Sequence, residues 1–278
     1  MARRTYPHQG HILRHLELSH RRLPDGSLTA TMPAYADLCD PDGFLRLGAV
    51  ATLVDSVAGQ HGVLQVRPDW VATLHLGTVI DRAAEGNLVT ALCSPLRVGR
   101  NNLVTETVVS DDRGEFGRSL CTYARLPARA DNPAGPGEEE YQVDFREDEP
   151  LDPRPPLDEY LQVRPRPSDA VVDLDHHSRI YNSFGSIQGG AVVVLMEIGG
   201  THLAGLLSGR RARCIGADVH YLSQARGGPF EVRAERIATA GDVVVSRVRI
   251  IDVGSDDRLL SVATVTTELT SDDYRTNG

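Results

Sequence analysis

Two stretches of this chain are so alike that we expect them to form the same structural element. GAVATLVDSVAGQH, from Gly48 to His61, aligns with GAVVVLMEIGGTH, from Gly190 to His202, at an offset of 142 residues. Self-similarity at one long offset is typical of a unit that occurs twice in a chain. The second stretch is apolar nearly all round, which predicts a helix enclosed by the protein rather than one on its surface.

The segments after the two helices predict the same series of β-strands. Apolar and polar residues alternate in VTETVV and VSRVRI, which is the period of half-buried strands. A strand-like stretch, HLELSH or YLQVRP, also precedes each helix. The sequence therefore predicts an α+β fold in which each helix lies in the curve of an antiparallel sheet. The strands are expected at 71–80, 87–98, 102–111 and 117–126, and again at 215–223, 229–238, 242–251 and 258–269.

A proline-rich, acidic stretch separates the two copies. It contains NPAGPGEEE and EDEPLDPRPP, and so many prolines exclude a regular helix or a central strand. The length of 278 residues suits two units of roughly 130 residues each. We expect an N-terminal unit at 1–126, a linker at 127–156 and a C-terminal unit at 157–278.

Composition argues against several classes of protein. The net charge is −9 and the 29 basic residues, all arginine, are scattered, so a nucleic-acid partner is not expected. Asp55 and Glu197 interrupt the longest apolar stretches, and the positively charged N-terminus carries no apolar run, so neither a membrane span nor secretion is expected. The cysteines lack CxxC spacing, which favours a reducing cytoplasm and no metal site. They are Cys39, Cys93, Cys121 and Cys214.

The two helices each carry one carboxylate at the same place. Asp55 and Glu197 follow the first glycine of their helices by seven residues, inside otherwise apolar sequence. A buried carboxylate is costly unless it is hydrogen-bonded or paired. Each could be a structural group that caps a helix or pairs with an arginine, or a general base or nucleophile.

A polar, glycine-rich segment leads into the second helix. NSFGSIQGG runs from Asn182 to Gly190 and ends at a helix N-terminus, where unpaired N–H groups and the helix dipole favour negative charge. Gly189 and Gly190 would let a carbonyl approach the main chain as in an oxyanion hole. Taken alone, the segment is better explained as a plain loop-to-helix turn.

The spacing of these residues resembles the Asn…His-Gly-Gly…Asp/Glu pattern of hotdog thioesterases, in the group with phenylacetyl-CoA and hydroxybenzoyl-CoA thioesterases. Asn182 precedes Gly189 by seven residues, and Gly189 precedes Glu197 by eight. The resemblance covers nearly the whole chain outside the linker. It implies a double hotdog, with two antiparallel sheets each wrapping a central helix and forming an intrachain pseudo-dimer. It also implies an acyl-CoA substrate, no cofactor, and pairing of such molecules into a homodimer.

In that family each site combines the Asn and Gly residues of one unit with the carboxylate and a nearby hydroxyl of the other. Gln188 stands where histidine is usual; glutamine donates and accepts hydrogen bonds but cannot gain a proton. The composite site implied by the resemblance joins Asp55 and Thr73 to Asn182, Gln188, Gly189 and Gly190.

The reciprocal site departs from the pattern. Asp40 replaces the asparagine, Leu47 replaces the first glycine, and Gly216 aligns with Thr73. We therefore expect one active site per chain and a secondary, degenerate site. The degenerate site would combine Asp40, Arg46, Leu47 and Gly48 with Glu197 and Thr201.

Two further groups of residues are of types that could bind a ligand. Because coenzyme A carries phosphates, Arg97, Arg100 and Arg226 are candidates for its entrance, and each is alternatively a solvated surface residue. The pair His176 and His177 has no second ligand motif, which indicates a polar loop rather than a metal site.

The sequence thus predicts an enzyme that hydrolyses acyl-CoA thioesters at one composite site. Asp55 would activate water or attack the carbonyl carbon itself, and both routes stay open. The main alternative is a non-catalytic acyl-CoA or acyl-ligand binding protein on the same scaffold. A dehydratase ranks third, because neither His61 nor His202 precedes its helix as that chemistry requires.

Overall fold

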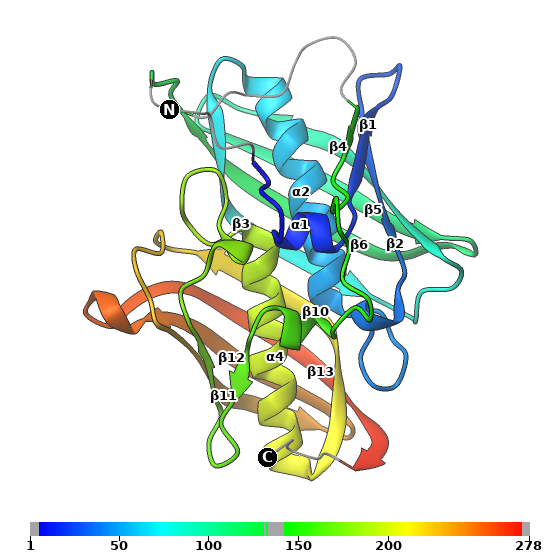
Figure 1. Ribbon diagram of the computed structural model, residues 1–278, viewed down its shortest axis with the longest axis vertical. Coiled ribbons are helices and arrows are strands. Elements are labelled where there is room, and N and C mark those ends of the chain that lie inside the picture. Colours follow the sequence, from blue (N-terminus) through cyan, green and yellow to red (C-terminus); the bar gives the residue numbers. More distant parts are fainter. Residues whose placement is uncertain (1–5, 131, 133–141, 274–278) are drawn as a thin grey trace.

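The computed structural model describes residues 6–130, 132 and 142–273. Two helix-and-sheet units lie one beyond the other along the longest axis of the molecule (Figure 1). The long helices α2 (Leu47–Val66) and α4 (Gly189–Ser208) lie in front of the strands in this view. The α+β plan expected from the sequence is therefore present in both halves.

The two halves have the same order of elements. The first comprises α1 (Ile12–His15), β1 (Ser19–Arg22), β2 (Leu28–Pro33), the 3-10 turn η1 (Ala36–Leu38), α2, β3 (Trp70–Ile80), β4 (Leu88–Val98), β5 (Asn102–Asp111) and β6 (Gly114–Leu126). The second comprises α3 (Leu157–Tyr160), β8 (Arg164–Pro165), β9 (Val171–Leu174), η2 (Ser178–Ile180), α4, β10 (Arg210–Tyr221), β11 (Phe230–Ala240), β12 (Val243–Asp252), η3 (Val253–Ser255) and β13 (Arg258–Asp273). Every long helix and strand predicted from the sequence has its counterpart in this order.

The strands form one antiparallel sheet rather than two separate ones. Its order is β7-β1-β2-β4-β5-β6-β3-β10-β13-β12-β11-β9-β8, where β7 is the short strand Gln142–Asp144. The halves join where β3 pairs with β10, from Gly216 opposite Val79 to His220 opposite His75. The two expected sheets are thus fused edge to edge, which leaves neither central edge strand unpaired.

Local chemistry sets the ends of the long helices. The side chain of Gln188 accepts a hydrogen bond from the Ala191 N–H at the start of α4, and Gly209 ends that helix in the left-handed conformation at φ 69°. Pro68 follows α2 and disfavours further helix there. By length and hydropathy α4 could cross a membrane, contrary to the expectation that Glu197 interrupts it too early, but 83% of its 18-residue apolar window is buried within the protein.

Two glycines let α2 and α4 pack with their backbones in close approach. A Cβ on Gly48 would lie 2.5 Å from the Cα of Val194, and one on Gly190 would lie 2.2 Å from the Cα of Thr52. The two contacts are equivalent under exchange of the halves, and they show that the helices run antiparallel. This approach brings the start of each helix to the carboxylate of the other.

The segments before the long helices differ from the sequence prediction. Only two residues of each stretch are in a strand: the end of HLELSH begins β1, and the end of YLQVRP is the whole of β8. The first residue of each stretch is the last residue of α1 or α3. Within the expected linker, β7 (Gln142–Asp144) pairs with β1 at the edge of the sheet, where a strand next to proline-rich sequence is tolerated. Residues 131 and 133–141 of that linker lie outside the described residues, as do 1–5 and 274–278 of the expected units.

Candidate active site

Asp55 accepts hydrogen bonds from both halves of the chain. The Thr73 hydroxyl donates to Oδ1 at 3.1 Å, while Gln188 Nε2 and the Gly190 N–H donate to Oδ2 at 2.7 and 3.2 Å. Asp55 lies on α2 and is 8% exposed. The structure therefore brings together Asp55, Thr73, Gln188, Gly189 and Gly190, five of the six residues expected at the composite site.

Gln188 links the helix start to the carboxylate. Its Oε1 accepts from the Ala191 N–H at 2.8 Å, which leaves its amide nitrogen to face Asp55. Gly189 lies against the same carboxylate, because a Cβ at this position would lie 2.6 Å from Asp55 Oδ1. No larger residue than glycine fits there without displacing Asp55.

Burial controls the acidity of Asp55. It raises the pKa of this carboxyl from 3.8 to about 6, while the hydrogen bonds from Thr73 and Gly190 act in the opposite direction. The group is consequently mostly ionised at neutral pH and lies close enough to neutrality to exchange a proton during a reaction.

Glu197 occupies the equivalent place against the start of α2. It accepts from the Leu47 N–H at Oε1 and from the Gly48 N–H at Oε2, at 3.2 and 2.7 Å. Burial raises its pKa from 4.5 to about 7, and the charge of Arg46 and these two N–H groups oppose the rise. Glu197 is therefore a cap on the N-terminus of α2.

The two sites differ in the backbone N–H groups that the carboxylate leaves without an acceptor. At α2 both leading N–H groups, those of Leu47 and Gly48, are bonded to Glu197. At α4 the Gly190 N–H bonds to Asp55, whereas the Gly189 N–H has no acceptor among the described residues. Only the α4 site thus has a donor at a helix N-terminus that is ready for another group.

The supporting residues of the second site differ from those expected. The Thr201 hydroxyl donates to the backbone carbonyl of Glu197 at 2.9 Å and not to its carboxylate. A bulge in each strand places Thr73 beside Tyr123 and Cys214 beside Thr267, so Cys214 and not Gly216 is the counterpart of Thr73. The alignment of Thr73 with Gly216 was therefore two residues too far along the chain: the same bulge follows Thr73 in β3 and Cys214 in β10, and this shared feature identifies the equivalent positions.

Asn182 lies in the loop before α4 and stabilises that loop. Its Oδ1 accepts from the Phe184 and Ser186 N–H groups at 3.0 and 3.1 Å. Asp40 makes the same pair of bonds to Asp42 and Phe44 in the first half. The replacement of asparagine by Asp40 therefore leaves the loop unchanged, and a role of Asn182 toward a substrate stays a prediction.

Tyr221 supports the site and was missed by sequence reasoning. Its hydroxyl donates to the Gly189 carbonyl at 2.7 Å, and burial together with the charge of Asp55 raises its pKa well above 10. Tyr123, opposite Thr73 on β6, is buried beside the same carboxylate. Both lie in strands whose alternation predicts inward-facing positions, but nothing in the sequence says which inward position meets Asp55.

The expected coenzyme A arginines, Arg97, Arg100 and Arg226, are exposed. Arg97 and Arg100 belong to the β4–β5 hairpin, whose base lies in one row with Tyr123 and Thr73 across the sheet. Arg226 follows Ala225, whose N–H donates to Ser186 Oγ in the loop before α4. Their binding role stays a prediction.

Known proteins resemble the chain in sequence. No model of a protein family matches it. The proofreading thioesterase EntH of Cronobacter turicensis is 32% identical over 114 residues, which cover 41% of this chain and 81% of that protein. EntH of Cronobacter sakazakii matches with the same identity and coverage.

Solved structures resemble it over nearly the whole chain. A hot dog fold protein of unknown function from Alicyclobacillus acidocaldarius superposes with a TM-score of 0.60 at 10% identity, covering 93% of this chain and 97% of that one. An acyl-ACP thioesterase from Bacteroides thetaiotaomicron superposes with a TM-score of 0.58 at 16% identity, covering 86% and 97%. These likenesses confirm the double hotdog fold.

Proposed function

Since this chain belongs to the hotdog-fold thioesterases, we propose that the thioesters it hydrolyses are those of coenzyme A, at one composite site between its halves. The site consists of Asp55 and Thr73 from the first half and of Gln188, Gly189 and Gly190 from the second. The observation that carries the proposal is the Gly189 N–H, which lies beside a buried carboxylate and has no acceptor among the described residues.

The geometry supports polarisation of the thioester carbonyl by the start of α4. The carbonyl oxygen would accept from the Gly189 N–H, where the dipole of a 20-residue helix favours the negative charge that develops on it. Tyr221 supports this position, because its bond to the Gly189 carbonyl fixes the next peptide unit, between Gly189 and Gly190. A donor fixed before the reaction needs no reorganisation when the charge appears.

Asp55 would carry out the step at the carbonyl carbon. An ionised carboxylate offers about four acceptor positions, and Oδ2 already uses two of them. Among the described residues, Oδ1 accepts only from Thr73 and keeps a lone pair that can take a proton from water or attack the carbon directly. In the first case the thiolate leaves after water adds; in the second it leaves as an anhydride forms with Asp55, which water then cleaves.

Gln188 would position Asp55 rather than donate a proton. Its side-chain amide is held by hydrogen bonds to Ala191 and Asp55, and an amide does not gain or lose a proton near neutral pH. A thiol has a pKa near 8.5, about seven units below that of water, so a thiolate leaves without strong acid assistance. The absence of the histidine usual in the family is therefore compatible with thioester cleavage.

The experiment compares the two carboxylates. Thiol release is measured with short, long and aromatic acyl-CoAs for the parent, Asp55→Asn and Glu197→Gln. Asp55→Asn should lower kcat by about 10²- to 10⁴-fold, the usual contribution of a general base. Glu197→Gln, the matched control at the equivalent position, should stay close to the parent at temperatures where it is folded.

The opposite pattern, with Glu197→Gln inactive and Asp55→Asn intact, would reverse the assignment of the site. No release by the parent above background, with acyl-CoAs still raising the melting temperature, would favour the binding protein. Acyl-ACP substrates cleaved in place of acyl-CoAs would keep the site and change the carrier. A single turnover in labelled water separates the two routes, since label in Asp55 excludes the general-base route.

A further inference from the structure

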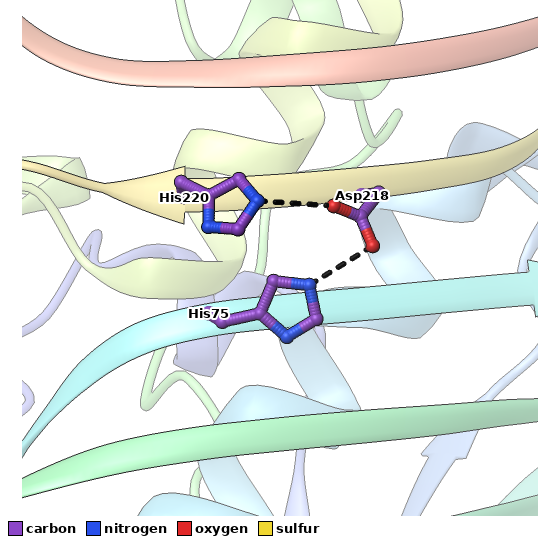
Figure 2. A group of neighbouring side chains, drawn as sticks. All are labelled: His75, Asp218 and His220. Carbon is purple, nitrogen blue, oxygen red and sulfur yellow. Dashed lines mark hydrogen bonds and ion pairs between the residues drawn. The ribbon is translucent and has the colours of Figure 1, made fainter.

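Two histidines and an aspartate meet on the face of the sheet that is turned away from the long helices. His75 on β3 lies directly opposite His220 on β10, and Asp218 lies two residues before His220 (Figure 2). Their neighbours Leu76 and Val219 are fully buried, so alternation directs the three side chains to the outer face. The cluster therefore lies on the seam that joins the two halves of the chain.

The three side chains are close enough to share one ion. His75 Nε2 lies 2.9 Å from Asp218 Oδ2, and His220 Nε2 lies 3.4 Å from Asp218 Oδ1. One ligand atom from each residue lies within 4.8 Å of the other two. Ligands about 2.0 Å from a tetrahedral zinc ion are about 3.3 Å apart, so rotamer adjustments alone would complete the arrangement.

From this geometry we propose that His75, Asp218 and His220 form a binding site for a divalent transition metal ion of the Zn²⁺ class. Two imidazole nitrogens and one carboxylate suit zinc, whereas Mg²⁺ and Ca²⁺ prefer oxygen ligands throughout. The remaining coordination position faces solvent, because Asp218 and His220 are exposed.

The small residue opposite Asp218 and the partners of its carboxylate both leave the cluster accessible to an ion. Gly77 lies opposite Asp218, and a Cβ there would come within 3.3 Å of both Asp218 Oδ2 and the His75 ring. Within the described ranges Asp218 pairs with the two imidazoles and with no arginine, although arginine is the partner of most paired carboxylates in this chain. The carboxylate is thus available to complete a metal site.

A metal ion at this site would connect β3 and β10, the two strands that support the Asp55 centre. His75 follows Thr73 by two residues on β3, and His220 directly precedes Tyr221 on β10. An ion held by both strands would join the halves at the point where Thr73 meets Asp55 and Tyr221 meets Gly189. The proposal does not depend on the reaction at that centre.

The test measures metal binding directly on the full chain. Protein carrying Cys39→Ser, to remove the one cysteine that is not buried, is freed of metal with a chelator and titrated with ZnCl₂ by calorimetry. We expect one Zn²⁺ per chain. His75→Ala and His220→Ala should each weaken binding by more than about tenfold, since even outer-shell changes cost 10- to 100-fold. Zn²⁺ should also raise the melting temperature of the parent and not of these variants.

The control is His176→Ala, which removes an exposed histidine beside the exposed Asp175 and should leave zinc binding unchanged. Co²⁺ in place of zinc should give the visible absorption of a low-coordinate ion with the parent only. No binding by the parent, or equal binding by His75→Ala, His220→Ala and His176→Ala, would overturn the proposal. Matching circular dichroism of the metal-free proteins guards against misfolding.

Discussion

Asp55 and Glu197 occupy equivalent positions and differ by one methylene group, and this difference separates the two sites. The longer Glu197 reaches two N–H groups at the start of α2. The shorter Asp55 reaches one N–H and is completed by the side chains of Thr73 and Gln188. As a result the start of α4 keeps a donor that the start of α2 does not.

Replacement of Thr73 by valine should change the pH dependence of hydrolysis. The Thr73 hydrogen bond lowers the pKa of Asp55, so its loss should raise that pKa above about 6. In the proposed reaction, activity requires the ionised carboxylate and falls as pH drops through its pKa, so the acidic limb of kcat/KM should move upward by about one pH unit. The control Thr107→Val removes a buried hydroxyl elsewhere in the same sheet. If the acidic limb of Thr73→Val lies at the same pH as that of the parent, the Thr73 hydroxyl does not control the ionisation of Asp55.

Glu197 should make folding stability fall with pH. Its pKa is about 7 in the folded protein against 4.5 in the unfolded chain. The folded state therefore holds a proton that the unfolded state has released, and this stability, full below pH 4.5, is lost as pH rises through about 7. Between pH 5 and 8 the free energy of unfolding of Glu197→Gln should decrease by about 2 kcal/mol less than that of the parent, measured with urea. Parallel curves would contradict the burial of this charge.

At the scale of elements, the close approach of α2 and α4 decides whether the composite site exists. Gly190→Ala would place a methyl group 2.2 Å from the Cα of Thr52, where backbone cannot yield easily. We expect a loss of about 1–3 kcal/mol in unfolding free energy, together with loss of hydrolysis, because α4 must move away from Asp55.

The matched control is Gly59→Ala on α2, where nothing lies within 4 Å of the added methyl group. Alanine is the better helix former, so this variant should gain about 0.5–1 kcal/mol. Equal stability of Gly190→Ala and Gly59→Ala in urea would show that the helices are farther apart than the structure places them.

At the scale of the whole molecule, the halves share one core and one sheet. Buried apolar residues of both halves form a single cluster. The ring of His15 on α1 stacks on that of Tyr160 on α3, with centroids 3.7 Å apart. Each half therefore depends on the other for part of the packing of its buried side chains. Pairing of two such molecules into a homodimer and a cytoplasmic location stay predictions.

Unfolding should therefore be a single transition for the whole chain. Trp70, the one tryptophan, begins β3 and packs edge-on against Phe184 of the other half at 5.1 Å, so its fluorescence reports contact between the halves. Its midpoint in urea should coincide with that of far-ultraviolet circular dichroism. Two separate midpoints would show that the halves unfold independently.

The sequence by itself determined the order of elements, the internal similarity of the halves and the presence of one carboxylate in each core helix. Those features depend on local periodicity and on residue identity at fixed spacing. It also placed Thr73, Gln188, Gly189 and Gly190 around Asp55, but only through resemblance to a family.

The tertiary structure alone decided how the groups are used. Which N–H groups reach Asp55 and Glu197 depends on the distance between α2 and α4, and the bonded residues are 133 to 150 residues apart in the chain. The equivalent bulges after Thr73 and Cys214 showed that Cys214, and not Gly216, is the counterpart of Thr73. The fusion of β3 with β10 brought His75 to Asp218 and His220. No local preference encodes these distances, because they arise from packing between segments that are remote in sequence.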